Sequence, residues 1–231
     1  MESIRTVLFD LDGTLIDSIE LIRRSYEHAV RVHLGRELER GEWLAGLGRP
    51  LRWQFSQYVR DEREVEAMIA TYRGWNLAHH DELVRPYPGA AEAVRALHER
   101  GLAIAIVTSK LHASARRGLA HCGFEDLFDV VIGVDDVAEH KPHPAPVLAA
   151  LARLGRDARS AVMVGDSPHD LAAGRAAGTR TAAVAWGPFD SAALQACAPD
   201  HWIAAPADLA GFSSVSAVGL DPNAAQPARG A

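Results

Sequence analysis

The stretch VLFDLDGTLID, residues 7–17, ends an apolar run in two carboxylates that stand one residue apart. The apolar residues from Ile4 to Phe9 are typical of a central parallel strand, which is buried on both faces. Asp10 and Asp12 then follow the carboxyl end of that strand, where open α/β sheets bind their ligands. Gly13 lets the chain turn, so both carboxyl groups can reach one site. Two like charges this close require a cation or a shared proton between them.

If these residues stood alone, an acidic strand end followed by an ordinary Asp-Gly turn would explain them as well. A second segment, LAIAIVT (residues 102–108), is another apolar, β-branched run. It ends in Thr108 and Ser109, whose hydroxyl and N–H groups can bind phosphoryl oxygens or, alternatively, cap the next helix. A strand that ends in hydroxyl residues therefore favours an anion site without proving one.

Two later segments carry charged residues at comparable places. In HKPHP, residues 140–144, Lys141 opens a helical segment predicted to run to about Leu154, and a lysine there can reach a phosphate as a point charge. The buried strand AVMV, residues 161–164, is followed by Asp166 and, four residues later, by Asp170. Asp170 falls in the first turn of a predicted helix, where a carboxylate can also simply complement the helix dipole.

Taken in order, these four segments resemble the four motifs of the haloacid dehalogenase-like hydrolase superfamily. The resemblance implies a magnesium-dependent phosphoryl-transfer site. Lysine usage supports it: the chain has 24 lysines and arginines together, yet lysine stands only at Lys110 and Lys141, both next to these motifs.

The resemblance also implies a role for each residue. Asp10 would be the nucleophile that forms an aspartyl-phosphate, and Asp12 the general acid and base. Mg²⁺ would be held by the Asp10 carboxylate, the Asp12 backbone carbonyl and Asp166. Asp170 would bind a metal-bound water or orient Lys141. The transferring phosphoryl group would be bound by Thr108, the Ser109 N–H and Lys141.

Other branches of the superfamily require residues that differ here. The dehalogenase branch lacks the second carboxylate of the first motif, which Asp12 supplies in this chain. The phosphonoacetaldehyde branch needs a lysine for a Schiff base, and residues 17–84 contain none. The sugar phosphomutase branch uses a histidine where this chain has Ile22. A phosphatase is therefore predicted; the alternatives are a sugar phosphomutase and a non-catalytic binding or regulatory protein that reuses the fold.

Helices and strands are predicted to alternate from Gly89 onward, which indicates an α/β fold with a doubly wound parallel sheet. The predicted strands are 4–9, 102–107, 129–134, 161–164 and 180–184, and the predicted helices 89–100, 113–121, 142–154 and 169–177. A helical block at 17–84 interrupts this alternation and resembles the small α-helical cap of one subclass. We therefore predict a Rossmann-like core (1–16 and 85–211), an inserted cap (17–84) and a flexible tail (212–231).

Composition excludes several classes of function. The net charge is −6 and no basic block stands out, which disfavours nucleic-acid binding. Apolar runs are only as long as strands, so no membrane span is predicted. A strand predicted to begin close to Met1 leaves no room for a signal peptide, and two cysteines make no disulfide framework. We expect a cytoplasmic enzyme with a small phosphorylated substrate, either a monomer or a homodimer.

The substrate is less well determined by the sequence. The segment GLGRPLR, residues 46–52, resembles the specificity loop of this subclass, in which Arg49 could bind a carboxylate or a distal phosphate. A surface arginine in a Gly/Pro turn is an equally good explanation. Phosphoglycolate phosphatases and a pyrophosphatase-like group share this cap type, and GDSPHD (165–170) favours the latter modestly. The aromatic residues expected to form the cap core are Trp43, Trp53, Phe55 and Tyr58.

Overall fold

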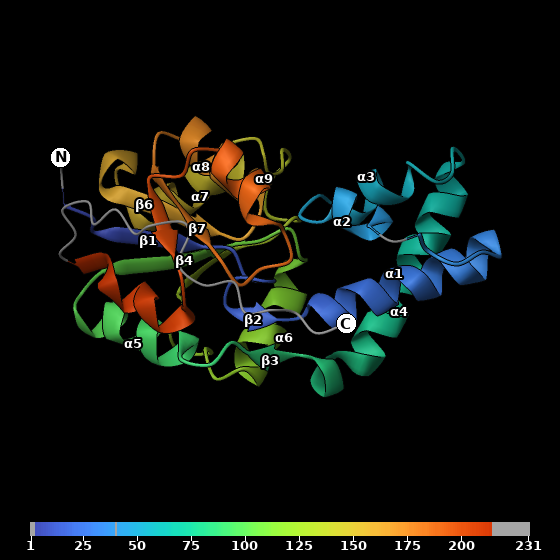
Figure 1. The fold of residues 1–231 in the computed structure, drawn as a ribbon, viewed down its shortest axis with the longest axis horizontal. Helices are drawn as coiled ribbons and strands as arrows, with labels where there is room; N and C mark the ends of the chain where they lie inside the picture. Colours follow the sequence, from blue (N-terminus) through green and yellow to red (C-terminus); the bar gives the residue numbers. More distant parts are fainter. Residues whose placement is uncertain (1–2, 40, 214–231) are drawn as a thin grey trace.

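The computed structural model describes residues 3–39 and 41–213, which form an α/β core with a helical region at one end (Figure 1). Six strands within this part of the chain form one parallel sheet in the order β5-β4-β1-β6-β7-β8. Their bounds are β1 (Thr6–Phe9), β4 (Ala103–Val107), β5 (Val130–Ile132), β6 (Ala161–Gly165), β7 (Arg180–Val184) and β8 (His201–Ile203). The predicted doubly wound sheet is confirmed, with β1 at its centre.

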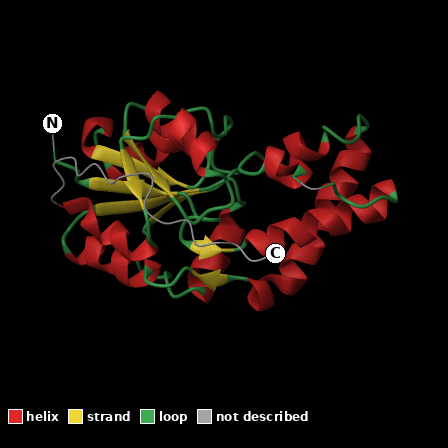
Figure 2. Ribbon diagram, in the orientation of Figure 1, coloured by secondary structure: helices red, strands yellow, loops and turns green. Residues whose placement is uncertain are grey.

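Helices cover both faces of this sheet, as Figure 2 shows. One face is covered by α5 (Ala90–Glu99), α6 (His112–His121) and the 3₁₀ segment η2 (Pro206–Ser213). The other face is covered by α7 (Ala145–Leu154), α8 (Pro168–Ala176) and α9 (Ser191–Ala196). A short 3₁₀ turn, η1 (Ala158–Ser160), leads into β6. None of the helices in the described ranges is long and apolar enough to cross a membrane.

The central strands are mostly apolar, and their alternate side chains enter two different cores. Val7 and Phe9 of β1 lie in the cluster under α5 and α6, whereas Leu8 lies in the cluster under α7 and α8. Ile106 and Val107 of β4 divide between the two clusters in the same way. Burial on both faces fixes the position of β1, and therefore of the carboxylates that follow it.

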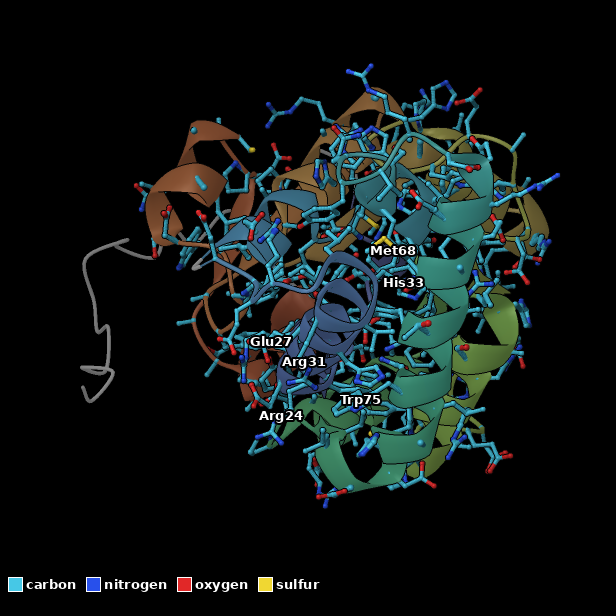
Figure 3. All side chains as sticks on the ribbon, turned by 90° about the vertical axis from the view of Figure 1, so that its right-hand side faces the viewer. Arg24, Glu27, Arg31, His33, Met68 and Trp75 are labelled. Carbon is cyan, nitrogen blue, oxygen red and sulfur yellow. The ribbon has the colours of Figure 1, made fainter. Side chains whose placement is uncertain are left out.

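The helical region is inserted directly after β1, and we call it the cap. It comprises α1 (Ile19–Leu34), α2 (Glu42–Gly46), α3 (Leu51–Phe55) and α4 (Glu62–Leu83). The chain enters and leaves it through two short antiparallel strands, β2 (Ile16–Asp17) and β3 (Arg85–Pro86). Figure 3 views the molecule from the cap end, with α1 and α4 side by side. His33 Nε2 of α1 is hydrogen-bonded to the Thr71 hydroxyl of α4 at 2.8 Å.

Helical spacing builds the cap core. Tyr26 and Val30 of α1 and Met68 and Tyr72 of α4 repeat at intervals of four, and all four are buried in one cluster. The prediction for the cap aromatics holds for Phe55, which is fully buried, but is wrong for Trp53, which is 40% exposed. Trp53 instead lies under the guanidinium group of Arg49, whose Cζ is 4.5 Å from the centroid of the Trp53 ring.

The end of the chain differs from the prediction. β8, α9 and η2 were not anticipated, and Phe212, where the tail was expected to begin, is buried against the sheet. The core therefore includes Phe212, while residues 214–231 lie outside the described part. The helix expected at 142–154 begins only at Ala145, because Pro142 and Pro144 precede it and a proline ring disfavours helical backbone at the residue before it.

Two buried threonines of the sheet give a test of this core. Thr6 in β1 and Thr181 in β7 are both fully buried, but the Thr6 hydroxyl has no hydrogen-bond partner, whereas that of Thr181 donates to Asp200 Oδ2 at 3.0 Å. We expect Thr6→Val to raise the free energy of unfolding by about 1 kcal/mol, because it removes an unsatisfied buried group. The matched Thr181→Val should lower it by about 1 kcal/mol. Urea denaturation measures the free energy of unfolding of both variants. Equal changes in the two variants would contradict the conclusion that, of these two hydroxyls, only that of Thr6 lacks a partner.

Candidate active site

The predicted site residues meet at the carboxyl edge of the sheet. Phe9 of β1 pairs with Ile106 of β4 and with Val164 of β6, so the three strands end side by side. The Asp10 N–H continues this ladder by donating to the Val164 carbonyl at 2.9 Å. Parallel strands therefore deliver three chain segments that lie far apart in the sequence to one place.

Three carboxylates gather there. Oxygen atoms of Asp10, Asp166 and Asp170 all lie within 4.8 Å of one another, and all three residues are at least nine-tenths buried. The pKa of Asp10 is raised to about 7: burial is the largest cause, Asp170 and Asp12 add to the rise, and Lys141 opposes it. Burial likewise raises the pKa of Asp166 well above its ordinary value, with Asp10 and Asp170 contributing. Such a cluster of buried oxygen donors is typical of a divalent metal site.

Lys141 is the cation that holds this cluster together. Its Nζ donates to Asp10 Oδ1 at 2.7 Å, to Asp170 Oδ1 at 2.6 Å and to the Val107 carbonyl at 3.0 Å. Burial would lower the pKa of this lysine, but the charges of Asp10 and Asp170 outweigh it and raise that pKa. Lys141 is therefore a fixed positive charge with all three donors engaged.

Asp170 is bonded within the protein through both oxygens. While Oδ1 accepts from Lys141, Oδ2 accepts from the Ser167 hydroxyl at 2.6 Å and from the Ser167 N–H at 3.1 Å. The Ser167 N–H bond, together with the Asp170 N–H, which donates to the Ser167 hydroxyl at 3.3 Å, forms a capping box at the start of α8. A side chain at Gly165 would place its Cβ 2.3 Å from the Asp170 Cβ, so glycine is required for this approach. Asp170 is thus oriented toward Lys141 by the helix start itself.

Asp12 lies beside this cluster and has a different set of partners. Its Oδ1 accepts from the Ser18 hydroxyl and from the Lys110 ammonium group. Within the described residues Oδ2 of Asp12 has no hydrogen bond. The sequence had singled out Lys110 only for its rarity, and no motif had indicated Ser18. These contacts fix one oxygen of Asp12 and leave the other available.

Two glycines let the backbone approach Asp166. A Cβ at Gly13, where φ is +81°, would lie 2.4 Å from Asp166 Oδ2, and one at Gly187 would lie 2.4 Å from the Asp166 Cβ. The Thr14 hydroxyl donates to Asp166 Oδ1 at 3.2 Å, and Trp186 Nε1 donates to the Thr14 carbonyl at 3.0 Å. The site therefore includes contacts from Thr14 and Trp186 whose roles the sequence did not reveal.

A cavity of about 650 Å³ lies above these groups, between the cap and the core. From the core it is lined by Asp10, Asp12, Thr108, Ser109, Lys110 and Asp166. From the cap it is lined by residues that include Ile22 of α1 and Arg49 of the loop between α2 and α3. The structure thus brings together around one cavity Asp10, Asp12, Asp166, the predicted phosphoryl-binding turn and the predicted specificity loop. Asp170 and Lys141 do not line it, and Lys141 is bonded to both Asp10 and Asp170.

The specificity loop contacts the phosphoryl-binding turn directly. The Ser109 hydroxyl donates to the Gly48 carbonyl at 2.7 Å. Gly48 has φ +87°, and a Cβ there would lie 3.2 Å from His169 of α8. The backbone of the cap therefore rests on two of the core segments that carry site residues.

Comparison with known proteins agrees with this geometry. The family model of the haloacid dehalogenase-like hydrolases matches residues 7–184, and the chain belongs to that family. It is 40% identical to the pyrophosphatase PpaX of Halalkalibacterium halodurans over 93% of this chain and 99% of the relative. Among solved structures, a haloacid dehalogenase-like hydrolase from Bacteroides fragilis superimposes with a TM-score of 0.84, at 25% identity, over 90% of this chain and 100% of the other. A predicted phosphoglycolate phosphatase from Haemophilus somnus shares the fold, with a TM-score of 0.81 at 24% identity over 93% and 100%.

The hydrogen bond between Ser109 and Gly48 predicts a measurable effect on the cap. Ser109→Ala keeps the backbone N–H but removes this contact, which is worth about 1 kcal/mol and so shifts the balance between open and closed cap about five-fold. Amide hydrogen exchange of residues 46–49 should become faster. Ser56→Ala is the matched control, since the Ser56 hydroxyl donates only within the cap, to the Trp53 carbonyl at 2.8 Å. Equal exchange in both variants would show that Ser109 does not hold the loop.

Proposed function

We propose that the protein is a Mg²⁺-dependent phosphatase that hydrolyses pyrophosphate or a small phosphorylated metabolite through an aspartyl-phosphate. The observation that carries this proposal is the position of Asp10, at the end of the central strand, bonded to Lys141 and open to the cavity. The identity to relatives named pyrophosphatase supports pyrophosphate as the first substrate to test.

The residues present fit a magnesium ion. Asp10, Asp166 and Asp170 provide only oxygen donors, which Mg²⁺ prefers, and Lys141 alone cannot balance three buried carboxylates. We infer that the Asp10 and Asp166 carboxylates and the Asp12 backbone carbonyl hold the ion. Because the two oxygens of Asp170 accept hydrogen bonds from Lys141 and Ser167, we propose that this residue orients Lys141. When bound, the ion would neutralise phosphoryl oxygens and reduce the repulsion that a phosphate meets at Asp10.

The reaction then proceeds in two displacements. An oxygen of Asp10 attacks phosphorus while the bond to the leaving oxygen breaks, and Asp12 gives its proton to that oxygen. A water molecule then attacks the aspartyl-phosphate and gives its proton to Asp12, which releases phosphate and restores Asp10. Lys110 and Ser18 hold one oxygen of Asp12, so the proton moves through the other.

The transferring phosphoryl group needs donors around its equatorial oxygens. We assign this task to the Thr108 hydroxyl and the Ser109 N–H, which line the cavity, while Lys141, whose three donors are engaged, contributes its positive charge beside Asp10. The cap loop that carries Arg49 rests on Ser109, and closure of this loop would exclude bulk water from the intermediate. Arg49 would meet the part of the substrate that leaves.

Two alternatives from the sequence have less support. A sugar phosphomutase would place a histidine in the first cap helix, but the matching residue, Ile22, lines the cavity with an apolar side chain. A non-catalytic binding protein would not need the complete set of catalytic groups found here. We retain as predictions the division into a core (1–16 and 85–211, extended to Phe212 by its burial) and a cap (17–84), a cytoplasmic location, and a monomer or homodimer.

A substrate panel tests the proposed activity. We expect phosphate release from pyrophosphate, 2-phosphoglycolate or a related compound with Mg²⁺, and none with a chelator. Asp10→Asn should reduce turnover by at least ~10³-fold, since it removes the nucleophile, while circular dichroism and thermal midpoint stay near those of the wild type. Full activity of this variant would show that Asp10 is not the nucleophile. A folded wild type that is inert toward the whole panel would favour the binding-protein alternative.

Metal binding has a second readout that does not need turnover. Without a cation, Asp10 keeps a proton up to a pKa of about 7, against 3.8 ordinarily, so the stability of the metal-free protein falls as pH rises through that interval. Mg²⁺ binds the ionised cluster, so we expect the thermal midpoint to rise with added Mg²⁺, more at pH 8 than at pH 5.5. Asp166→Asn should lower the shift strongly. A shift that is the same in this variant would place the ion elsewhere.

A further inference from the structure

The cap contributes to the cavity one helical face that no motif indicated. Ile69, Tyr72, Arg73 and Asn76 of α4 stand at positions i, i+3, i+4 and i+7, and all four line the cavity. Tyr72 is buried and Asn76 donates to the Ser25 hydroxyl at 3.1 Å, so these two belong to the packed interior of the cap. Arg73 is the member of this face that carries charge and is exposed.

The charges around the cavity are unevenly balanced. Four cationic side chains line it, namely Arg49, Arg52, Arg73 and Lys110. Lys110 is paired with Asp12, and Arg52 is paired with Glu62 and Glu66. Within residues 3–39 and 41–213, neither Arg49 nor Arg73 forms an ion pair, and the guanidinium group of Arg49 lies over the Trp53 ring. The cap lining therefore carries three arginines against two glutamates, a net charge of +1, and two of its guanidinium groups, those of Arg49 and Arg73, have no ion pair of their own within the described part of the chain.

The core side has the opposite character. Asp10 and Asp166 line it with carboxylates, and the only buried lysine of the described chain, Lys141, is already shared between Asp10 and Asp170. A substrate between the two sides has its reacting phosphoryl group at Asp10 and its leaving group toward the cap. A leaving group that carries its own negative charge would meet two arginines there, and that charge grows as the bond to phosphorus breaks.

We propose that Arg73 acts with Arg49 to bind an anionic leaving group, and that Arg73 thereby makes the enzyme specific for phosphoanhydrides and for esters with a second anionic group. The inference rests on the proposed phosphatase function and extends it. Arg49 comes from the loop that contacts Ser109, whereas Arg73 comes from α4, which is packed on α1. Two donors on different cap elements can hold the anion from two directions, which a single arginine cannot do.

The test compares two kinds of substrate in the full-length, Mg²⁺-loaded protein. Pyrophosphate and 2-phosphoglycolate have leaving groups with a second anionic group, whereas para-nitrophenyl phosphate has none. For Arg73→Ala we expect kcat/KM to fall about 10- to 100-fold for the better of the two anionic substrates, as for loss of a charged hydrogen bond. The value for para-nitrophenyl phosphate should change less than about three-fold. Arg73→Lys should recover part of the loss, because it keeps the charge but not the fork of donors.

Arg63→Ala is the matched control. Arg63 is an exposed arginine at the start of the same helix that does not line the cavity, so its removal changes the net charge equally. It should leave kcat/KM unchanged for both kinds of substrate. An equal loss in Arg63→Ala and Arg73→Ala would assign the effect to net charge and overturn the proposal.

The remaining outcomes separate this inference from the proposed function. Wild-type activity toward para-nitrophenyl phosphate that needs Mg²⁺ establishes the phosphatase. If the kcat/KM of Arg73→Ala then falls equally for both kinds of substrate, or falls for neither, Arg73 does not select the leaving group. A wild type that turns over para-nitrophenyl phosphate but neither anionic substrate also overturns the inference. Inactivity toward every compound refutes the phosphatase function, and the role of Arg73 with it.

Discussion

The mutual repulsion of Asp10, Asp166 and Asp170 is the constraint around which the site is built. Three carboxylates whose oxygens lie within 4.8 Å of one another, in a buried place, can be held only by protons or cations. Lys141 supplies one positive charge and, through its third donor, ties that charge to the end of β4. The remaining imbalance is what a divalent ion would satisfy. The glycines at 13, 165 and 187 follow from the same constraint, since each leaves room beside one of these carboxylates.

Much of this arrangement could be predicted because it is local in sequence. Asp10, Thr108 and Asp166 each follow an apolar strand, and parallel strands deliver their ends to one edge, so proximity follows once the strands are recognised. Lys141 was predicted from its motif, although its helix begins later than expected. The specific task of Asp170 could not be chosen in advance, because orienting Lys141 and binding a metal water both suit that position. The contacts of both oxygens with Lys141 and Ser167 are the reason why we propose the lysine-orienting role.

The parts that escaped prediction depend on packing between distant segments. The pairing of Lys110 with Asp12 joins the ends of two strands 98 residues apart, and nothing in either segment identifies the partner. Trp53 was expected in the cap core because large aromatic residues usually are buried. It lies instead at the cavity under Arg49, since α3 is only five residues long and cannot bury all its apolar side chains. Phe212 was misjudged because the apolar sites that bury it come from a face of the sheet far away in sequence.

The division of charge between core and cap bears on the choice of substrate. A metal-bound core that accepts a phosphoryl group is common to every phosphatase of this design, so it cannot distinguish one phosphate compound from another. The cap can distinguish them, because its lining combines the apolar side chain of Ile22 with Arg49 and Arg73, which form no ion pairs with the described residues. A neutral sugar in that place would leave both guanidinium groups without an anion and would offer hydroxyl groups to an isoleucine. A phosphate or carboxylate leaving group would instead be neutralised as its charge develops. The lining of the cap therefore favours small substrates with two anionic groups, of which pyrophosphate is the simplest.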